Sequence, residues 1–421
     1  MGRTGAIAWR GPAPAAAGAR IAATAGVIGV GVFGATLYAL PQYLFPAIEP
    51  LRVGVITAAL MYLGLLARWL LGGGAPTAGG LRGLGLVALL GVALLSPAWS
   101  LDPAASRAAS AELLKMGLAY VAVASLVDRP DRLRRVIGAL ALAAAVPAYH
   151  AVQNYLTGTD LLEGYRARWA GLFLDPNRLG MSLVASALLL VGLRPRAKSP
   201  VSQLAVAALL ALQVTAIIVT YSRGAALGLA TGFVVYVLSG RGSKVQSAAI
   251  VGAIAVALLA LAPERFWQRT ETIATYEEDA SALGRIHAWK TAENILAARP
   301  FTGVGQAAFV PAWASYAPPE AGARAYVAHN LFLEVAAELG IVALVGFLVL
   351  AFAALRGALR ASGPRSPVRE EGRAILAALA GYLVCQLFAG YLLSFFLFFF
   401  LGLATAAERI ARRAADPEET P

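Results

Sequence analysis

Long runs of apolar residues alternate with short polar stretches along most of the chain. Many of these runs approach the roughly 20 residues that an α-helix needs to cross the hydrocarbon core of a bilayer. The pattern therefore predicts an all-α integral membrane protein with about twelve transmembrane helices, in which residues 1–421 form a single membrane domain. The predicted spans are 21–38, 53–71, 83–96, 112–127, 133–154, 178–193, 203–219, 224–239, 247–262, 329–355, 374–388 and 391–407.

The longest hydrophilic segment, residues 263–328, separates the ninth and tenth predicted spans. It is not of low complexity, and a loop of more than about 15 residues is usually functional or disordered. Residues 284–298 have the pattern of a short helix, with Trp289 and Ile295 available to pack, and Pro300 ends it. We therefore expect a large, partly helical loop between spans 9 and 10.

Composition excludes an ordinary soluble domain. Apolar residues make up 59% of the 421 positions and charged residues only 14%, whereas soluble domains carry about a quarter charged residues. The net charge of +12 would suggest nucleic-acid binding in a soluble protein. Here the basic residues lie in short loops between spans, so membrane orientation explains them better and no nucleic-acid partner is expected.

The distribution of basic residues predicts the orientation of the chain. Cytoplasmic loops of membrane proteins are enriched in Lys and Arg. The basic segments 129–135 and 356–373 satisfy this rule if the N-terminus is cytoplasmic. Residues 1–20 and 408–421 are then cytoplasmic tails, and 263–328 lies on the outer face.

Arginines on the predicted outer face are candidate anion ligands. Arg223 lies in a very short turn between two spans, where its guanidinium could bind a phosphate with two hydrogen bonds or simply snorkel from a helix end. Arg285 would begin the loop helix, whose N-terminus favours anions, or would be a solvated loop charge. Arg166 and Arg168 could reach an anionic substrate, although solvent exposure explains Arg166 equally well.

The three histidines differ in context. His329 begins the tenth predicted span, where the helix dipole disfavours the imidazolium, so a neutral ring is available as a general base. Capping or packing is an equally good explanation. His287 follows Arg285 by two residues and could be a loop surface residue. His150 lies inside the fifth predicted span, where it is either functional or bonded to a neighbouring helix.

Several signals for other chemistry are absent from the sequence. It contains no cluster of Cys and His, no Asp-x-Asp motif and no P-loop, so we expect neither a metal nor a cofactor. The run Glu277-Glu278-Asp279 could bind a cation, but an acidic loop run is more often only solvated. The predicted spans carry few charges at their centres, which argues against an ion-coupled transporter.

Five short motifs follow one another between residues 168 and 340. They are Arg168-Trp169-Ala170-Gly171 with Asp175-Pro176-Asn177, Tyr221-Ser222-Arg223-Gly224, Gly284-Arg285 with Trp289, Pro300-Phe301-Thr302-Gly303-Val304-Gly305, and His329-Asn330 with Glu334 and Gly340. Together with the large outer loop, their order and spacing resemble those of the O-antigen ligase and polymerase superfamily of bacterial membrane glycosyltransferases.

This resemblance implies a fold like that of the C-type glycosyltransferases, located in the bacterial inner membrane with the active site on the periplasmic face. It implies a glycan donor linked to a polyprenyl diphosphate such as undecaprenyl diphosphate and, for a ligase, the lipid A–core of lipopolysaccharide as acceptor. The length and the single compact outer loop look most like a ligase. An O-antigen polymerase or a protein O-oligosaccharyltransferase of the same superfamily is an alternative, and an anion or lipid carrier is an alternative of another class.

The implied reaction assigns roles to the candidate residues. Arg223 and Arg285 would stabilise the charge that grows on the diphosphate leaving group, without a metal. His329 would take the proton of the acceptor hydroxyl, and direct in-line displacement would invert the anomeric centre. The other residues expected to contact the diphosphate or glycan are Arg166, Arg168, Asn177 and Asn330.

Overall fold

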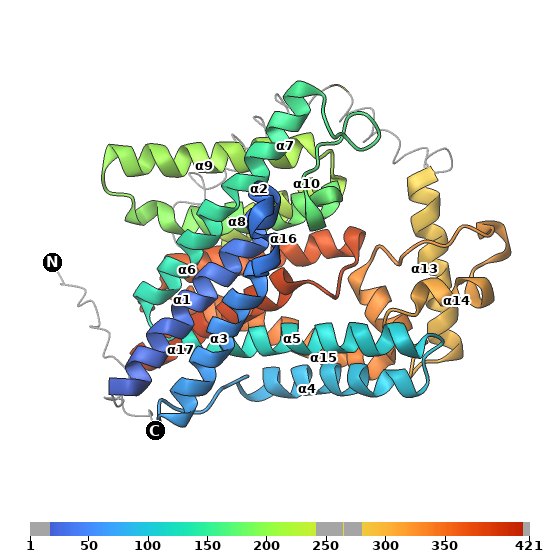
Figure 1. Cartoon of the computed structure of the whole chain (residues 1–421), viewed down its shortest axis with the longest axis horizontal. Helices are drawn as coiled ribbons and strands as arrows, with labels where there is room; N and C mark the ends of the chain where they lie inside the picture. Colours follow the sequence, from blue (N-terminus) through green and yellow to red (C-terminus); the bar gives the residue numbers. More distant parts are fainter. Residues whose placement is uncertain (1–16, 241–263, 265–279, 416–421) are drawn as a thin grey trace.

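A computed structural model describes residues 17–240, 264 and 280–415. In this part of the chain the protein is a bundle of α-helices, with α13 and α14 standing at one end of it (Figure 1). The α-helices are α1 (Ala17–Ala39), α2 (Pro41–Leu44), α3 (Val53–Leu70), α4 (Gly80–Leu95), α5 (Pro103–Leu126), α6 (Pro130–Ala143), α7 (Ala145–Thr157), α8 (Pro176–Leu193), α9 (Pro200–Val219), α10 (Arg223–Leu238), α13 (Ala280–Ala298), α14 (Phe309–Tyr316), α15 (Leu331–Ala361), α16 (Arg369–Ala389) and α17 (Phe395–Ala415). The 3₁₀ helices are η1 (Pro46–Leu51), η2 (Ser96–Ala98), η3 (Gly171–Leu174), η4 (Arg194–Arg196) and η5 (Pro319–Ala321).

The predicted all-α membrane fold is confirmed. Within the described residues, nine helical segments are long and apolar enough to cross a membrane, and α10 is a shorter apolar helix. Eleven of the twelve predicted spans coincide with described helices, the fifth being divided between α6 and α7. The remaining one, 247–262, lies outside the described residues, so the count of twelve stays a prediction.

The fourth predicted span was too short at its beginning. The apolar pattern begins at residue 112, but α5 begins at Pro103, because Asp102 caps the helix and accepts a hydrogen bond of 2.9 Å from the backbone N–H of Ala105. A capping carboxylate followed by proline is a strong helix start. Ser106, Arg107 and Ser110 in the first turns of α5 hide this part of the helix from a hydropathy pattern.

Glycine pairs bring three pairs of helices into backbone contact. A Cβ atom built on five of these six glycines would lie less than 3.0 Å from the partner helix, and one built on Gly26 would lie 3.3 Å from Gly64 and 2.9 Å from the Leu126 side chain of α5. Small residues allow this close approach in membranes, where van der Waals packing replaces the hydrophobic effect between helices. The pairs are Gly26 and Gly64 between α1 and α3, Gly85 and Gly346 between α4 and α15, and Gly228 and Gly381 between α10 and α16.

The helix predicted over 284–298 is present as α13, and it packs against α14 in a small apolar cluster of its own. Ile295 is fully buried in this cluster, together with Phe309 and Trp313. The cluster also includes Ala337 of α15, so it joins the α13 end of the bundle to a long apolar helix.

The motif at residues 300–305 docks onto a kink in α15. Gly340 has a left-handed φ of 76°, which interrupts the helix and leaves carbonyl groups without their usual partners. The N–H groups of Val304 and Gly305 donate to the carbonyls of Ala337 and Glu338 at 3.0 and 2.9 Å. The kink therefore fixes the segment that follows α13, and with it the helix that carries Arg285.

Replacing Gly340 with alanine should destabilise the protein. A Cβ atom there would collide with the carbonyl of Phe301, and alanine disfavours a φ of 76°. We expect a loss of about 1–3 kcal/mol, the usual cost of a strained backbone position, read as a lower thermal midpoint of the purified protein in detergent. Gly91→Ala is the control, because a Cβ atom at Gly91 of α4 meets nothing within 4 Å. Equal midpoints for the two variants would contradict this account of the kink.

Candidate functional site

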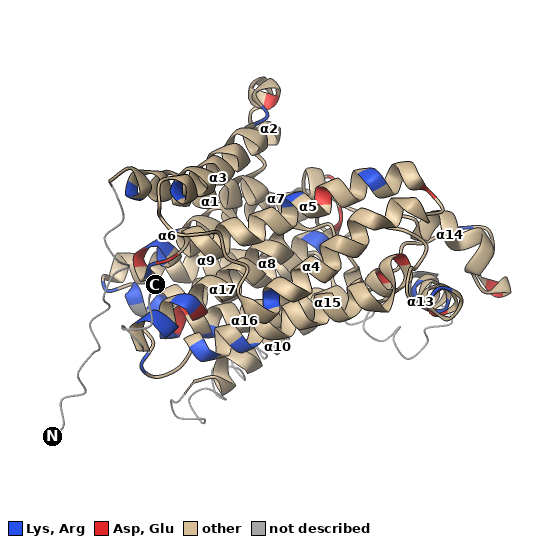
Figure 2. Ribbon diagram, turned by 90° about the horizontal axis from the view of Figure 1, so that it is seen from below, with Lys and Arg blue, Asp and Glu red and all other residues tan. Residues whose placement is uncertain are grey.

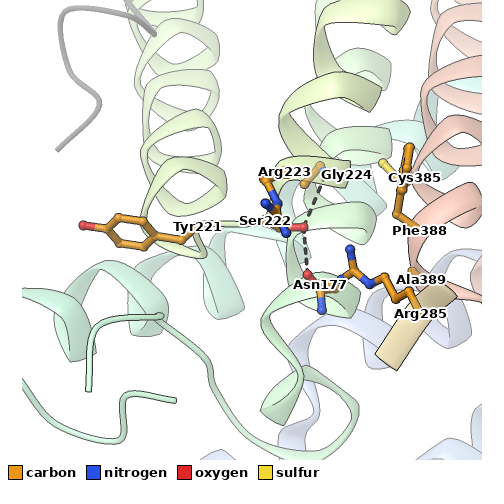
Figure 3. A pocket seen from close by; sticks show the side chains of 10 residues that line it. Asn177, Tyr221, Ser222, Arg223, Gly224, Arg285, Cys385, Phe388 and Ala389 are labelled. Carbon is orange, nitrogen blue, oxygen red and sulfur yellow. Dashed lines mark hydrogen bonds between the residues drawn. The ribbon is translucent and has the colours of Figure 1, made fainter. Parts of the chain in front are cut away.

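A pocket opens where the N-termini of α8 and α10 meet the C-terminus of α16 and the side of α13 (Figure 3). Its lining brings together Arg223, Arg285 and Asn177, three of the residues predicted from the sequence. Helix N-termini carry partial positive charge, which adds to that of the two guanidinium groups. The complete lining is Asn177, Tyr221, Ser222, Arg223, Gly224, Ala225, Arg285, Cys385, Phe388 and Ala389.

The sharp turn between α9 and α10 aims Arg223 at the pocket. Tyr221 has a left-handed φ of 51°, and its hydroxyl lies 2.9 Å from that of Tyr155. Its ring therefore points away from the two arginines (Figure 3). Ser222 then caps α10 by accepting a hydrogen bond of 3.3 Å from the N–H of Ala225, so that Arg223 is the first residue of the helix.

Arg285 reaches the pocket from the opposite wall, on α13 (Figure 3). The sequence placed it at a helix N-terminus, but α13 begins at Ala280, so Arg285 lies more than one turn inside the helix. The helix dipole therefore contributes little at this position. Gly284, the preceding residue, packs so closely on the ring of Tyr326 that a Cβ atom there would lie 2.7 Å from it. This contact sets the direction in which Arg285 leaves the helix.

Arg166 is buried, with 5% of its surface exposed, which excludes solvent exposure as the explanation of this residue. Its Nε donates to the carbonyl of Thr220 at 3.1 Å and its Nη2 donates to Oδ1 of Asn177 at 2.9 Å. Ser222 Oγ donates to the same Oδ1 at 3.0 Å. Arg166 thus braces the turn before α10 and orients the Asn177 amide, and it does not line the pocket itself.

Substituting Arg166 with lysine should lower stability, because one ammonium group cannot make both contacts. Hydrogen bonds from a charged group are worth about 1.5–3 kcal/mol each, so we expect a clear fall in thermal midpoint in detergent. Arg168→Lys is a matched control two residues away, because Arg168 is partly exposed and pairs with Asp160. If Arg168→Lys destabilises as much as Arg166→Lys, the bracing role of Arg166 is wrong.

Arg168 and Asn330 lie outside this pocket lining. Arg168 donates to Oδ1 of Asp160 from Nη2 at 2.7 Å and from Nε at 3.1 Å, and so closes the loop after α7. Asn330 is the N-cap of α15, and its Oδ1 accepts from the N–H groups of Phe332 and Leu333 at 3.0 and 3.2 Å. The structure thus gives both residues local structural contacts.

His329 lies directly behind the pocket wall. Its imidazole forms a hydrogen bond with the backbone of Ala389, which lines the pocket. A Cβ atom on the next residue, Gly390, would lie 2.5 Å from the N–H nitrogen of Asn330, so the turn after α16 fits tightly over His329. The imidazole Nδ1 is buried and has no hydrogen-bond partner among the described residues.

The surroundings of His329 favour its neutral form. Burial is the main cause that lowers its pKa, and the positive charge of Arg285 lowers the pKa further. The Asp175 carboxylate and the hydrogen bond with Ala389 act in the opposite direction. The sequence argument relied on the helix dipole for neutrality, whereas burial and Arg285 are the larger causes. The protonation of His329 therefore depends on the charge of Arg285.

The sequence missed the cluster that holds the turn after α16 in place. Tyr391 donates a short hydrogen bond to Oδ2 of Asp175, the N-cap of α8. The Arg178 guanidinium lies 3.5 Å from the centroid of the Tyr391 ring. Since 216 positions separate Tyr391 from Asp175, only the fold brings them together.

The other two histidines do not line this pocket. His150 stacks on Trp169, with 4.9 Å between ring centroids. Trp169 lies outside any helix, so this contact is not the bond to a neighbouring helix that the sequence offered as one explanation. His287 lies on α13, where its carbonyl accepts a hydrogen bond of 2.7 Å from the hydroxyl of Thr291.

Residues 206–348 match a protein-family model described as O-antigen ligase. The matched stretch contains Arg223, Arg285 and His329, whereas Arg166 and Asn177 precede it. No match was found among the curated proteins. The family match confirms the resemblance to the O-antigen ligase and polymerase superfamily and supports an activity of ligase or polymerase type in a multi-pass bacterial membrane protein.

Proposed function

We propose that the protein transfers a glycan from a polyprenyl-diphosphate carrier to the lipid A–core of lipopolysaccharide, on the periplasmic face of the inner membrane. The observation that carries this proposal is the pocket in which Arg223 and Arg285 face each other beside His329. Two guanidinium groups on opposite walls suit a diphosphate, because each can donate two parallel hydrogen bonds to its oxygens.

In this proposal the acceptor hydroxyl attacks the anomeric carbon as the bond from that carbon to the diphosphate oxygen breaks. The bonding electron pair stays on the diphosphate, and Arg223 and Arg285 stabilise the negative charge that develops there. The hydroxyl proton passes to Nδ1 of His329. Because Nδ1 is enclosed by protein, we expect acceptor binding to shift the turn at Ala389 and Gly390 and expose it.

Turnover should survive chelation, because the two arginines supply the positive charge that a divalent cation provides in many glycosyl transfers. The measurement is the initial rate of the purified enzyme with and without EDTA. A rate that collapses in EDTA and returns with Mg²⁺ would overturn this prediction. It would direct attention to Glu277, Glu278 and Asp279, which lie outside the described residues.

Deleting the gene and separating the lipopolysaccharide on a gel tests the reaction itself. For a ligase, the long-chain ladder disappears and lipid-linked polymer accumulates. If instead at most one repeat unit remains on the core and no lipid-linked polymer forms, the protein is a polymerase. Complementation with Arg223→Ala, which should fail, ties either result to the pocket.

A further inference from the structure

A second cavity, of about 390 Å³, lies at the opposite end of the helices from the glycan site. It is formed by the beginning of α4 and the C-terminal parts of α15 and α17. Lys and Arg residues are concentrated at this end of the molecule, near the C-terminal end of α17 (Figure 2). The basic side chains that line the cavity are Arg82, Arg356, Arg360, Arg409 and Arg412.

The positive charge in this cavity is only partly neutralised. Glu408 is the one carboxylate in its lining, and it is buried at 1% exposure. It pairs with Arg82, with Arg360 at 2.7 Å and with Arg412 at 2.8 Å. Three arginines therefore share a single carboxylate.

The two remaining arginines add charge without adding a counterion. Arg409 donates to the backbone carbonyl of Ala124. Arg356 is exposed, and no carboxylate within 4.0 Å of it is found in the described part of the chain. The cavity thus keeps an excess of positive charge that an anion can neutralise.

The arrangement is built into the helix interface. Gly357 of α15 faces the network, and a Cβ atom there would lie 2.7 Å from Oε2 of Glu408 and 2.8 Å from Nη2 of Arg82. Only glycine leaves room for this pair against α15. Basic residues that only orient a membrane protein can lie anywhere in the cytoplasmic loops. They do not have to line a cavity or pair with a buried carboxylate, as the arginines do here.

The same cavity has an apolar side. Leu81 and Phe352 line it, and they are 57% and 64% exposed. Both belong to helices that are long and apolar enough to cross a membrane, so exposed side chains of this kind face the hydrocarbon of the bilayer. Arginines beside apolar side chains at the ends of membrane spans match a phospholipid, with its phosphate against guanidinium groups and its acyl chains against the helices.

We propose that this cavity binds the phosphate of an anionic phospholipid headgroup from the leaflet at this end of the bundle. The contacts are made by Arg356, Arg360 and Arg412, while Phe352 contacts the acyl chain. A lipid here would hold the ends of α4, α15 and α17 together by taking up the charge that Glu408 leaves unbalanced. This site is independent of the proposed glycan transfer.

Native mass spectrometry of the full-length protein in detergent, titrated with phosphatidylglycerol or phosphatidylcholine, tests the proposal. We expect tighter binding of phosphatidylglycerol by the wild type. A basic residue near a membrane surface contributes about 1 kcal/mol toward anionic lipid, so the double variant Arg356→Gln and Arg360→Gln should bind it roughly 30-fold more weakly. Arg135→Gln with Arg365→Gln is the control of equal charge, since neither residue lines the cavity.

Three outcomes decide against the proposal. The first is equal phosphatidylglycerol binding by the wild type and the cavity variant, and the second is an equal loss in the control. The third concerns a soluble source of phosphate. If inorganic phosphate competes at the affinity of the lipid, and Phe352→Ser leaves phosphatidylglycerol binding unchanged, the cavity holds a soluble phosphate. If the Phe352→Ser variant binds phosphatidylglycerol more weakly and inorganic phosphate does not compete, the proposal of a phospholipid site is supported.

Discussion

Arg285→Ala and Arg223→Ala should each lose donor binding and turnover together. Both guanidinium groups contact the diphosphate before the reaction and stabilise more of its charge in the transition state, so the two effects are coupled. Removing one preorganised charge-stabilising group typically costs roughly 10²–10³-fold in rate. Lysine at either position should restore only part of the activity, because an ammonium group cannot make a two-pronged contact. The measurements are donor affinity and initial rate in nanodiscs.

Lys290→Ala is the matched control on α13. Lys290 is exposed, and its Nζ lies 3.1 Å from Oε1 of Glu320. It does not line the pocket. Its removal should leave donor affinity and turnover near those of the wild type. If the Arg223 and Arg285 variants also bind donor and turn over normally, the diphosphate assignment is wrong, and the carrier becomes the better explanation of the pocket.

Hydropathy predicts the helices of this protein well because a membrane span must be apolar over most of its length. It fails where polar residues begin a helix, as in α5, whose start depends on the cap at Asp102. The same limitation affects Arg285, because the small residues Ala280, Ser281 and Ala282 and the glycine at 284 hide the beginning of α13.

The site was predictable only in part, because residues far apart in sequence decide what each side chain contacts. Arg223 and Arg285 stood out as arginines on a face that should hold few of them, and both line the pocket. No feature of the neighbouring sequence distinguishes Arg166, because its hydrogen-bond partners Thr220 and Asn177 lie on other elements. Asn330 precedes an apolar run, and its context also fits the helix cap that the structure shows.

His329→Ala should abolish most turnover while leaving donor binding largely intact, because His329 lies behind the wall of the arginine pocket and does not line it. A positioned general base contributes roughly 10²–10⁴-fold, which sets the expected loss. His287→Ala on α13 is the control and should turn over normally. A near-normal rate for His329→Ala would show that His329 is not the general base. Either His287 would then be the base, or the reaction would proceed without an enzymic base.

The pH profile distinguishes a base from a residue that only supports the pocket wall. Only the neutral imidazole accepts a proton, so the rate should fall as the pH drops through the His329 pKa. Burial and Arg285 hold that pKa below its ordinary value of about 6.5. Arg285→Gln removes one cause of the lowering, so the acid limb of its residual activity should move to higher pH. Arg285→Lys keeps the positive charge and should leave the limb near its wild-type position. If the limb does not move in Arg285→Gln, or if it moves equally in both variants, His329 is not the group whose titration limits the rate.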